Sequence, residues 1–334
     1  MREGVFIKRI TYFNFNLLTK FLSLLMIIPV YLSEVLRSQV VIIYGAHIIG
    51  YQAIIYLCKL FGRKVIFRSL LLGSDDMASI FKKKSVCRKA FYRHMFRRLD
   101  LYFAINPVFD TRFRSQMGTG IDSITCPQGV DTDSFRPADS TTGMNLRNHL
   151  GINHNGFVIM SVGFLIDRKG FTEVFNILGE FTFDFRYMII GEYLFPRGHF
   201  LSGKKEEAAI IHNEGISVLG ERLILTGPVD HIAEYYQAAD LVLINSTREG
   251  LPNTLLEAMA CGRAVLIKSL PGVDYIIRHR ENGIIYKDSN EMKEWFYRLY
   301  QEPGLRMDLG QKARDFAESK ATFRQAWNQI ESFL

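Results

Sequence analysis

The feature that most constrains the fold is the segment EGLPNTLLEAMACG at residues 249–262, together with the apolar run before it. The run LVLI at residues 241–244 predicts a buried strand, and residues 255–260 have good helical propensity. Asn253 can cap the start of this helix, and Gly262 can end it. A strand, a loop and a helix in this order are typical of open α/β sheets, which bind ligands at the carboxyl ends of their strands.

The start of this helix is a predicted anion site. A helix N-terminus presents unpaired N–H donors and the positive end of the helix dipole, so the backbone of Asn253, Thr254 and Leu255 suits a phosphate or diphosphate. Glu249 and Glu257 frame this backbone in the sequence, and carboxylates bind hydroxyls rather than phosphate. The combination fits a ligand with phosphate in the middle and a polyol at both ends, which is the form of a nucleotide sugar.

The Glu-x(7)-Glu element of this segment resembles family 4 of the GT-B glycosyltransferases, which are retaining nucleotide-sugar enzymes. The resemblance implies that Glu249 binds sugar hydroxyls, that Glu257 binds the ribose, and that the backbone of residues 251–255 binds the diphosphate. The substrate contacts expected in this loop and helix start are Gly250, Leu251, Pro252, Asn253, Thr254 and Leu255.

The paired acids have two other interpretations. One is a loop acid followed by an unrelated acid on a helix surface. The other is a glycosidase pair, whose carboxylates face each other about 5 to 10 Å apart and usually come from separate elements. The capping residues, the glycines and the flanking strand all favour the nucleotide-sugar interpretation.

A second element, GFLIDRKG at residues 163–170, follows another predicted strand. It resembles the family's glycine-Arg...Lys-Gly element, whose cations neutralise the donor diphosphate as it leaves. Lys169 matches, Phe164 stands where the family often has arginine, and Arg168 is the nearest candidate to replace that charge. The alternative is that both are surface cations at a loop. We expect Glu249, Lys169 and Arg168 to be catalytic and Gly163 to contact the substrate.

The nucleotide base is expected beside TGPV at residues 226–229, with Pro228 and Val229 as its contacts. The segment CPQGVDTDSFRP at residues 126–137 resembles the one that closes the family's first domain, except that Gln128 replaces the usual asparagine.

Asp131 and Asp133 form the D-x-D pattern with which other glycosyltransferases hold a metal, but turn chemistry explains the pair in this fold class. We expect neither a metal site nor a cofactor, only the nucleotide diphosphate sugar as donor substrate.

A chain of 334 residues exceeds one core, and short apolar strands alternate with helical stretches along it. The expected class is α/β of GT-B type, with two Rossmann-like doubly wound domains facing each other across a cleft. The expected boundaries are residues 1–137 for the acceptor-side domain, 138–150 for a linker, 151–310 for the nucleotide-sugar domain and 311–334 for a helix packing back on the first domain.

The resemblance covers about residues 38–334, and the family's opening strand and glycine-rich turn have no counterpart before it. The first sheet would then have an edge strand with exposed N–H and C=O groups. A partner chain, self-association or the uncharged run at residues 21–33 is expected to cover this edge. That run is shorter than the roughly 18 to 20 apolar residues of a bilayer span.

Positive charge is concentrated in the first half, where residues 1–137 carry 20 Lys/Arg against 9 Asp/Glu. Between residues 77 and 99 there is no acid, and Cys87, Phe91, Met95 and Leu99 form an apolar row at helical spacing. The cations of this stretch are Lys82, Lys83, Lys84, Arg88, Lys89, Arg93, Arg97 and Arg98. They predict either a face on anionic lipid headgroups or a solvated face over a packing stripe, whereas no stacking platform or motif indicates nucleic-acid binding.

The expected function is retaining transfer of a hexose-type sugar to a glycan or lipid-linked acceptor. The alternatives are an inactive or incomplete transferase acting as a nucleotide-sugar-binding subunit, and a GT-B sugar-nucleotide epimerase. Four cysteines without a C-x-x-C pair fit a reducing cytosol, and no cleavable signal peptide is visible. The expected location is cytoplasmic and peripheral on the inner face of the cell membrane.

Overall fold

The computed structural model describes residues 17–45, 50–82, 84–137, 141–153, 156–193, 195 and 201–333. The chain divides into two compact units, one of Met1–Thr125 with Phe333–Leu334 and one of Cys126–Ser332. Each unit contains one sheet, and every strand pair among the described residues is parallel. The expected α/β class with two parallel sheets is confirmed.

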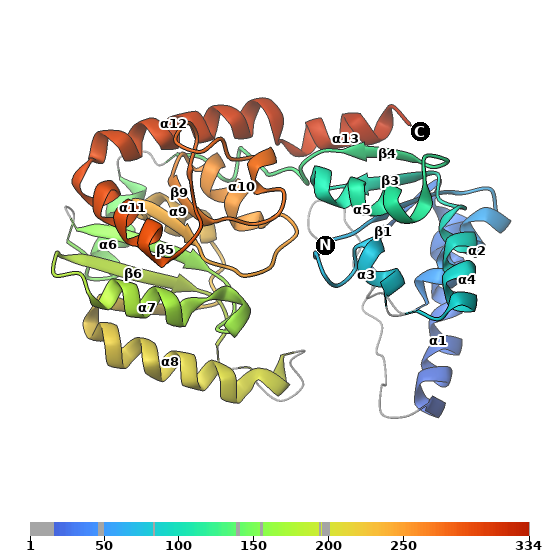
Figure 1. Ribbon diagram of the computed structural model, residues 1–334, viewed down its shortest axis with the longest axis horizontal. Coiled ribbons are helices and arrows are strands. Elements are labelled where there is room, and N and C mark those ends of the chain that lie inside the picture. The colour runs from blue at the N-terminus through green and yellow to red at the C-terminus, as the bar shows by residue number, and fades with distance from the viewer. Residues whose placement is uncertain are drawn as a thin grey trace. The chain divides into compact units, whose positions relative to one another are not determined.

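The first unit has a four-stranded sheet in the order β1-β2-β3-β4 (Figure 1). Its strands are β1 (Val40–Tyr44), β2 (Lys64–Arg68), β3 (Leu101–Ala104) and β4 (Asp122–Thr125). Its helices are α1 (Leu17–Arg37), α2 (Tyr51–Leu60), α3 (Met77–Lys82), α4 (Val86–Phe96) and α5 (Pro107–Met117). The strand β4 was not predicted, because its sequence DSIT has a single buried residue and no apolar run.

Helices α2, α4 and α5 cover one face of this sheet. Phe67 and Tyr102 are paired in register on β2 and β3, so both side chains point to the same face. On that face the ring centroid of Phe67 lies 5.9 Å from that of Tyr51 in α2 and 5.2 Å from that of Phe96 in α4. Tyr102 stacks on Phe113 of α5 with centroids 3.9 Å apart.

The strand β1 lies at one edge of the sheet, and within the described residues it pairs with β2 alone. The uncharged run at residues 21–33 forms part of α1, which packs against α2. In the part of the chain that is described, no helix has both the length and the hydropathy to cross a bilayer.

The second unit has a six-stranded sheet in the order β10-β9-β8-β5-β6-β7. Its strands are β5 (Phe157–Val162), β6 (Phe185–Ile190), β7 (Leu223–Gly227), β8 (Leu241–Ile244), β9 (Ala264–Lys268) and β10 (Ile284–Tyr286). Its α-helices are α6 (Thr142–His149), α7 (Phe171–Gly179), α8 (Lys205–Leu219), α9 (Ile232–Ala238), α10 (Asn253–Ala260), α11 (Ser289–Gln301), α12 (Pro303–Lys320) and α13 (Phe323–Glu331). Short 3-10 turns are η1 (Asp167–Lys169), η2 (Ser202–Lys204), η3 (Gly220–Arg222) and η4 (Val273–Tyr275).

Helices pack on both faces of this sheet. In Figure 1, α7 and α8 lie together below it, and α10 and α12 lie above it. The core on the α7 side includes Phe175, Tyr187 and Leu243, all at most 1% exposed. This coverage of both faces is what the continuous apolar runs of the strands require.

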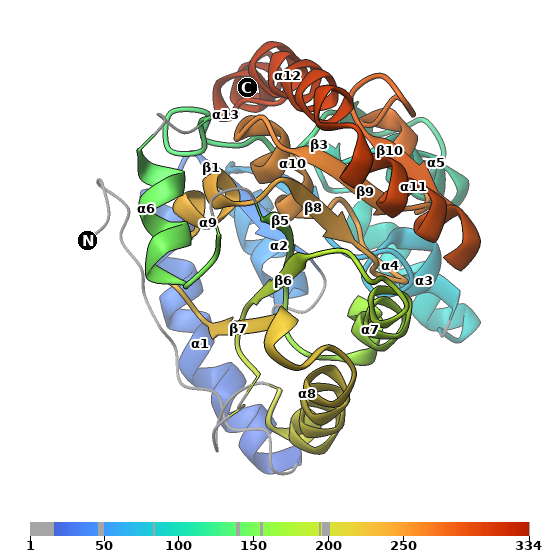
Figure 2. The ribbon, with the colours of Figure 1, turned by 90° about the vertical axis from the view of Figure 1, so that its left-hand side faces the viewer.

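The strand order places a topological switch point between β5 and β8, which are neighbours in the sheet (Figure 2). The chain adds β6 and β7 on one side of β5 and then returns to add β8, β9 and β10 on the other. Open sheets bind ligands at the carboxyl ends of the strands beside such a switch. Gly163 follows β5 there and Asn245 follows β8, so both predicted site segments begin at this point.

The structure differs from the expected segment boundaries in two places. The stretch at residues 138–150, expected as a linker, contains α6, which packs on α9. Arg147 fixes it there by donating to Ala238 O at 2.8 Å and to an Asp240 carboxylate oxygen at 2.8 Å. The expected boundary at residue 310 falls inside α12, and both α12 and α13 belong to the second unit.

Candidate active site

The predicted helix is present as α10, but it begins at Asn253, the residue that was predicted to cap it. Pro252 occupies the cap position with φ −64, and no side chain accepts a capping hydrogen bond. The Asn253 carboxamide oxygen instead accepts a hydrogen bond from Gln128. Gly262 follows the last turn at φ 65 and donates to Met259 O at 2.9 Å, which confirms the predicted stop.

The predicted anion site at this helix start has fewer open backbone donors than expected. The N–H of Leu255 donates to Pro252 O at 3.1 Å, so it is used within the turn. Among the described residues, the N–H groups of Asn253 and Thr254 have no acceptor. Two backbone donors, rather than three, therefore remain for a phosphate.

Glu249 lies between the two predicted cations. Its Oε1 is 2.9 Å from Lys169 Nζ and 2.8 Å from a terminal nitrogen of Arg168. Arg168 also donates to Arg248 O at 2.8 Å. The Glu249 and Lys169 side chains are 13% and 16% exposed, so this is a mostly buried pair with one open side. The three residues expected to be catalytic are brought together.

Gly163 lies directly against the Lys169 side chain. It adopts φ 153, and a Cβ at this position would lie 2.7 Å from Lys169 Cε. A larger residue here would therefore displace the lysine. Phe164 packs against Phe195 with ring centroids 5.8 Å apart, so the residue that replaces the family arginine is a packing residue. Arg168 is the second cation of the site.

Asn245 anchors the turn that carries Lys169. Its Nδ2 donates to Gly170 O at 2.7 Å and to Glu173 Oε2 at 3.0 Å, and its Oδ1 accepts from Tyr286 Oη at 2.6 Å. Asn245 is 4% exposed, so these bonds satisfy a buried amide. Asn245 follows β8, and Tyr286 belongs to β10. Their hydrogen bonds therefore fix the turn of Lys169 relative to both strands.

The pKa values of the two glutamates are shifted in opposite directions. Burial acts to raise the pKa of Glu249, but the charges of Lys169 and Arg168 and a hydrogen bond from Ser246 outweigh it and lower the pKa. Burial raises the pKa of Glu257, although the Tyr236 hydroxyl donates to Glu257 Oε2 at 2.7 Å and partly offsets this. Glu249 is therefore an ionised acceptor for hydroxyl groups at neutral pH.

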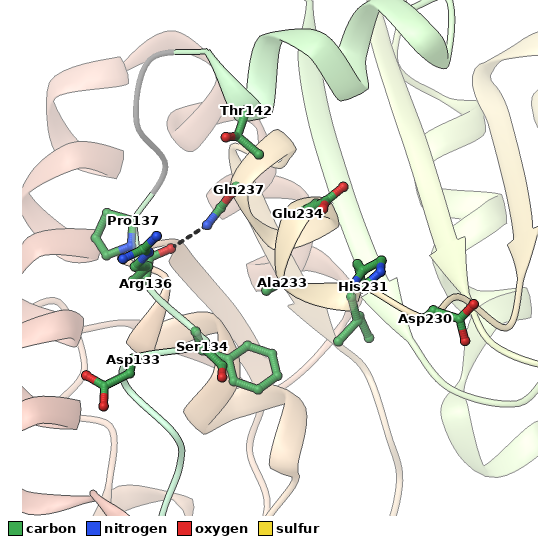
Figure 3. A pocket seen from close by; sticks show the side chains of 12 residues that line it. Asp133, Ser134, Arg136, Pro137, Thr142, Asp230, His231, Ala233, Glu234 and Gln237 are labelled. Carbon is green, nitrogen blue, oxygen red and sulfur yellow. Dashed lines mark hydrogen bonds between the residues drawn. The ribbon is translucent and has the colours of Figure 1, made fainter. Parts of the chain in front are cut away.

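Pro228 and Val229 follow β7 at the carboxyl edge of the same sheet, two strands from β5. No contact joins them to Lys169 or Glu249 within the described residues. They adjoin a pocket of about 860 Å³ that begins at Asp230 (Figure 3). Its lining residues are Asp133, Ser134, Phe135, Arg136, Pro137, Thr142, Asp230, His231, Ile232, Ala233, Glu234 and Gln237.

A smaller hollow lies at the switch point itself. It is lined by Lys169, Pro252 and Thr254 together with the ends of β5 and β8. The predicted cation and the predicted anion-binding turn therefore border the same space.

Asp131 forms a turn, in agreement with the interpretation of the D-x-D pattern as turn chemistry. Its carboxylate accepts from the N–H groups of Asp133 and Ser134 at 3.1 Å and from the Ser134 hydroxyl at 2.6 Å. These bonds, the Ser134 hydroxyl first, lower its pKa. In the portion of the chain that the structure describes, no group of three His, Cys, Asp or Glu side chains could hold a metal.

Sequence reasoning missed the residues that support the site. Gln128 donates from Nε2 to Leu251 O at 3.1 Å, so it fixes the loop before α10. Asn245 and Glu173 anchor the turn after β5. The signal for Asn245 was its place directly after a buried strand, whereas the partners of Gln128 are more than 120 residues away in the sequence.

Two parallel sheets in separate units, with the acid and cations at the switch point of one of them, define a GT-B protein. Anabaena HepE in complex with UDP and glucose has the same fold, with a TM-score of 0.74 at 18% identity, covering 92% of this chain and 82% of HepE. The trehalose-6-phosphate synthase OtsA has a TM-score of 0.73 at 13% identity, and the match covers 96% of this chain and 78% of OtsA. The chain belongs to the family Glycosyl transferases group 1, which matches residues 144–316.

Curated relatives lie in the same family. The D-inositol 3-phosphate glycosyltransferase of Pseudarthrobacter chlorophenolicus is 29% identical over 231 residues, covering 66% of this chain and 52% of the relative. The alpha-galactosylglucosyldiacylglycerol synthase of Streptococcus pneumoniae is 25% identical over 276 residues, which cover 80% of this chain and 70% of the relative. The chain thus spans about half the length of the inositol phosphate enzymes that it matches.

Proposed function

We propose that this chain transfers a hexose-type sugar from a nucleotide diphosphate sugar to a glycan or lipid-linked acceptor, with retention at the anomeric carbon. The observation that carries the proposal is the meeting of Glu249, Lys169 and Arg168 beside the start of α10. An ionised acid for hydroxyls, cations for a diphosphate and open backbone donors are the groups that a nucleotide sugar needs.

In this proposal the donor lies along the carboxyl edge of the six-stranded sheet. The N–H groups of Asn253 and Thr254 bind its diphosphate, and Glu249 accepts hydrogen bonds from the sugar hydroxyls. Glu257 accepts from the ribose with the oxygen that Tyr236 does not occupy. The base lies beside Pro228 and Val229.

Catalysis would then rest on charge stabilisation. Negative charge develops on the diphosphate as the sugar departs, and Lys169, Arg168 and the start of α10 stabilise it there. The leaving diphosphate can accept the acceptor's proton on the same face of the sugar. That route gives retention without a base supplied by the protein.

The names of similar proteins support the substrate classes. HepE was crystallised with UDP and with UDP-glucose, which favours a uridine diphosphate sugar as donor here. The relative named alpha-galactosylglucosyldiacylglycerol synthase supports a lipid-linked acceptor as one of the classes to test.

The test is to incubate the purified chain with UDP-glucose and other nucleotide sugars in the presence of lipid and glycan acceptors. Proton NMR of the product then gives its anomeric configuration. The proposal expects a product with the configuration of the donor. An inverted product would contradict it.

Two alternatives give other outcomes in the same assay. A sugar-nucleotide epimerase would convert the donor without any acceptor. A binding subunit would bind the nucleotide without turnover, and the edge strand β1 favours this candidate because a partner chain could pair with it. Light scattering over a range of concentrations tests that pairing: self-association is expected, and a monomer with full transfer activity would exclude the binding-subunit role.

A further inference from the structure

The helix α4 presents one outward side on which apolar and basic residues are exposed together. We define the α4 surface as the exposed residues of α4 and of its C-cap, namely Val86, Cys87, Arg88, Ala90, Phe91, His94 and Arg97. Val86 is 82% exposed and Phe91 is 47% exposed, and no acidic residue occurs from position 77 to 99. Apolar and basic side chains are thus interspersed from the first turn of the helix to its end.

The cations around the α4 surface fall into two groups. Arg93 donates to Gln116 O at 3.2 Å, and Arg98 lies 5.3 Å over the ring of Tyr56, so both stabilise the unit internally. By contrast Lys82, Arg88, Lys89 and Arg97 have no ion-pair partner among the described residues. Lys83, which belongs to the predicted basic run, lies outside those residues. Unpaired cations gathered in this way attract an extended anion.

The apolar row predicted on this helix has two different ends. Met95 and Leu99 are 0% and 6% exposed and pack in the core, whereas Cys87 and Phe91 face outward. Packing therefore accounts for only half of the row. Of the exposed half, Phe91 contacts the rings of Tyr56 and Tyr92, with ring centroids 6.4 and 5.8 Å apart, and its side chain is still 47% exposed.

The neighbouring helix α2 extends the apolar area. Tyr56 lies on α2 beside Phe91, and the two helices run side by side (Figure 1). Leu60, one turn beyond Tyr56, is 74% exposed. Apolar side chains are thus exposed on two adjacent helices.

We propose that α4 lies on the surface of an anionic lipid bilayer. Val86 and Phe91 would enter the boundary between headgroups and acyl chains, while Lys82, Arg88 and Arg97 meet the lipid phosphates. A nucleic acid would satisfy the cations but would leave Val86 and Leu60 in water. The inference does not depend on the proposed function, because it concerns the other unit and requires no turnover.

Flotation of the full chain with liposomes is the test. Vesicles of phosphatidylcholine alone are compared with vesicles containing about one third phosphatidylglycerol, in about 0.05 and 0.5 M salt. We expect binding to the anionic vesicles in low salt and a marked loss in high salt. Equal binding to both kinds of vesicle, or none to either, overturns the proposal.

Two pairs of variants assign the binding to α4. Arg88→Gln with Arg97→Gln should lower the affinity for anionic vesicles about 30-fold, at about fivefold per cation. Lys205→Gln with Arg324→Gln removes the same charge from exposed positions of the other unit. The affinity of this variant for anionic vesicles should stay within about twofold of wild type. Equal losses in the two pairs would show an effect of net charge alone and would overturn the assignment to α4.

A third variant separates lipid from nucleic acid. Phe91→Ser should lower vesicle binding about fivefold through lost apolar burial. Its affinity for a single-stranded RNA, used as a competing polyanion, should stay at the wild-type value. If RNA displaces the vesicles and Phe91→Ser leaves vesicle binding unchanged, the surface binds nucleic acid and the lipid proposal is wrong. Thermal unfolding confirms that each variant is folded.

Discussion

Lys169 Nζ lies 2.9 Å from Glu249 Oε1, although 80 residues separate the two in the sequence. The turn after β5 supplies the lysine and the loop after β8 supplies the glutamate. The cation therefore lies beside the acid that is proposed to bind the sugar. Charges fixed in this way by the fold are the kind that stabilise a transition state.

Lys169→Ala should lower turnover more than donor affinity. The partner of Lys169 in the reaction gains charge mainly as the sugar departs, so the lost interaction belongs to the transition state. A charged hydrogen bond contributes about 1.5 to 3 kcal/mol, so kcat should fall roughly ten- to hundredfold. Steady-state kinetics with separately measured donor affinity checks this. A rise in Kd as large as the fall in kcat would contradict the assigned role.

Arg168→Ala examines whether Arg168 replaces the family arginine at the position of Phe164. Arg168 shares Glu249 Oε1 with Lys169, so its loss should also reduce kcat, by about tenfold. Phe164→Arg in the Arg168→Ala background should restore part of that loss. If Arg168→Ala retains wild-type kinetics, the arginine has no part in the reaction.

The two glutamates should affect stability with opposite sign. Glu249 has a lowered pKa when folded, so its stabilising contribution is present above its unfolded pKa and is lost as pH falls through the folded value. Glu257 has a raised pKa when folded, so its ionisation destabilises the folded state. This destabilisation appears as pH rises from the unfolded pKa through the folded pKa. At about pH 7, Glu249→Gln should lower the free energy of unfolding and Glu257→Gln should raise it.

Urea unfolding at about pH 7 and again below about pH 4 measures both variants. At the acidic pH, the wild type and each variant should become nearly equal in stability. A Glu257→Gln variant that is less stable than wild type at neutral pH would show that its hydrogen bond from Tyr236 outweighs the cost of burial.

Gly170→Ala should damage both stability and turnover. Gly170 has φ 68, and a Cβ there would lie 2.6 Å from Asn245 O. The left-handed conformation alone costs alanine about 1 to 2 kcal/mol, and the contact would also push the turn of Lys169 away from β8. Gly304→Ala is the matched control, because it lies in α12 with no atom within 4 Å of the added Cβ. Similar urea midpoints and kcat for the two variants would contradict this account of the turn.

The sequence predicted the parts of the molecule that depend on local patterns. The strand at residues 241–244 was found as predicted, because buried parallel strands are short apolar runs. The helix α10 was predicted, but it begins at Asn253 rather than after it. Pro252 holds the cap position, and the Asn253 side chain accepts a hydrogen bond from Gln128 instead. The contacts of Gln128, Asn245 and Tyr286 join distant segments, and no local pattern in one sequence specifies such pairs.

The most direct test of the account is calorimetry with a bare nucleoside diphosphate, beginning with UDP, on wild type and two variants. A ribose contact exists with or without the sugar, so Glu257→Ala should weaken UDP binding roughly ten- to hundredfold. Glu249 is proposed to bind the sugar, which UDP does not contain. Glu249→Gln should therefore bind UDP with an affinity within about twofold of wild type and yet fail to transfer sugar. Equal losses of UDP affinity in the two variants, or no binding of any nucleoside diphosphate to the wild type, would contradict the site proposed here.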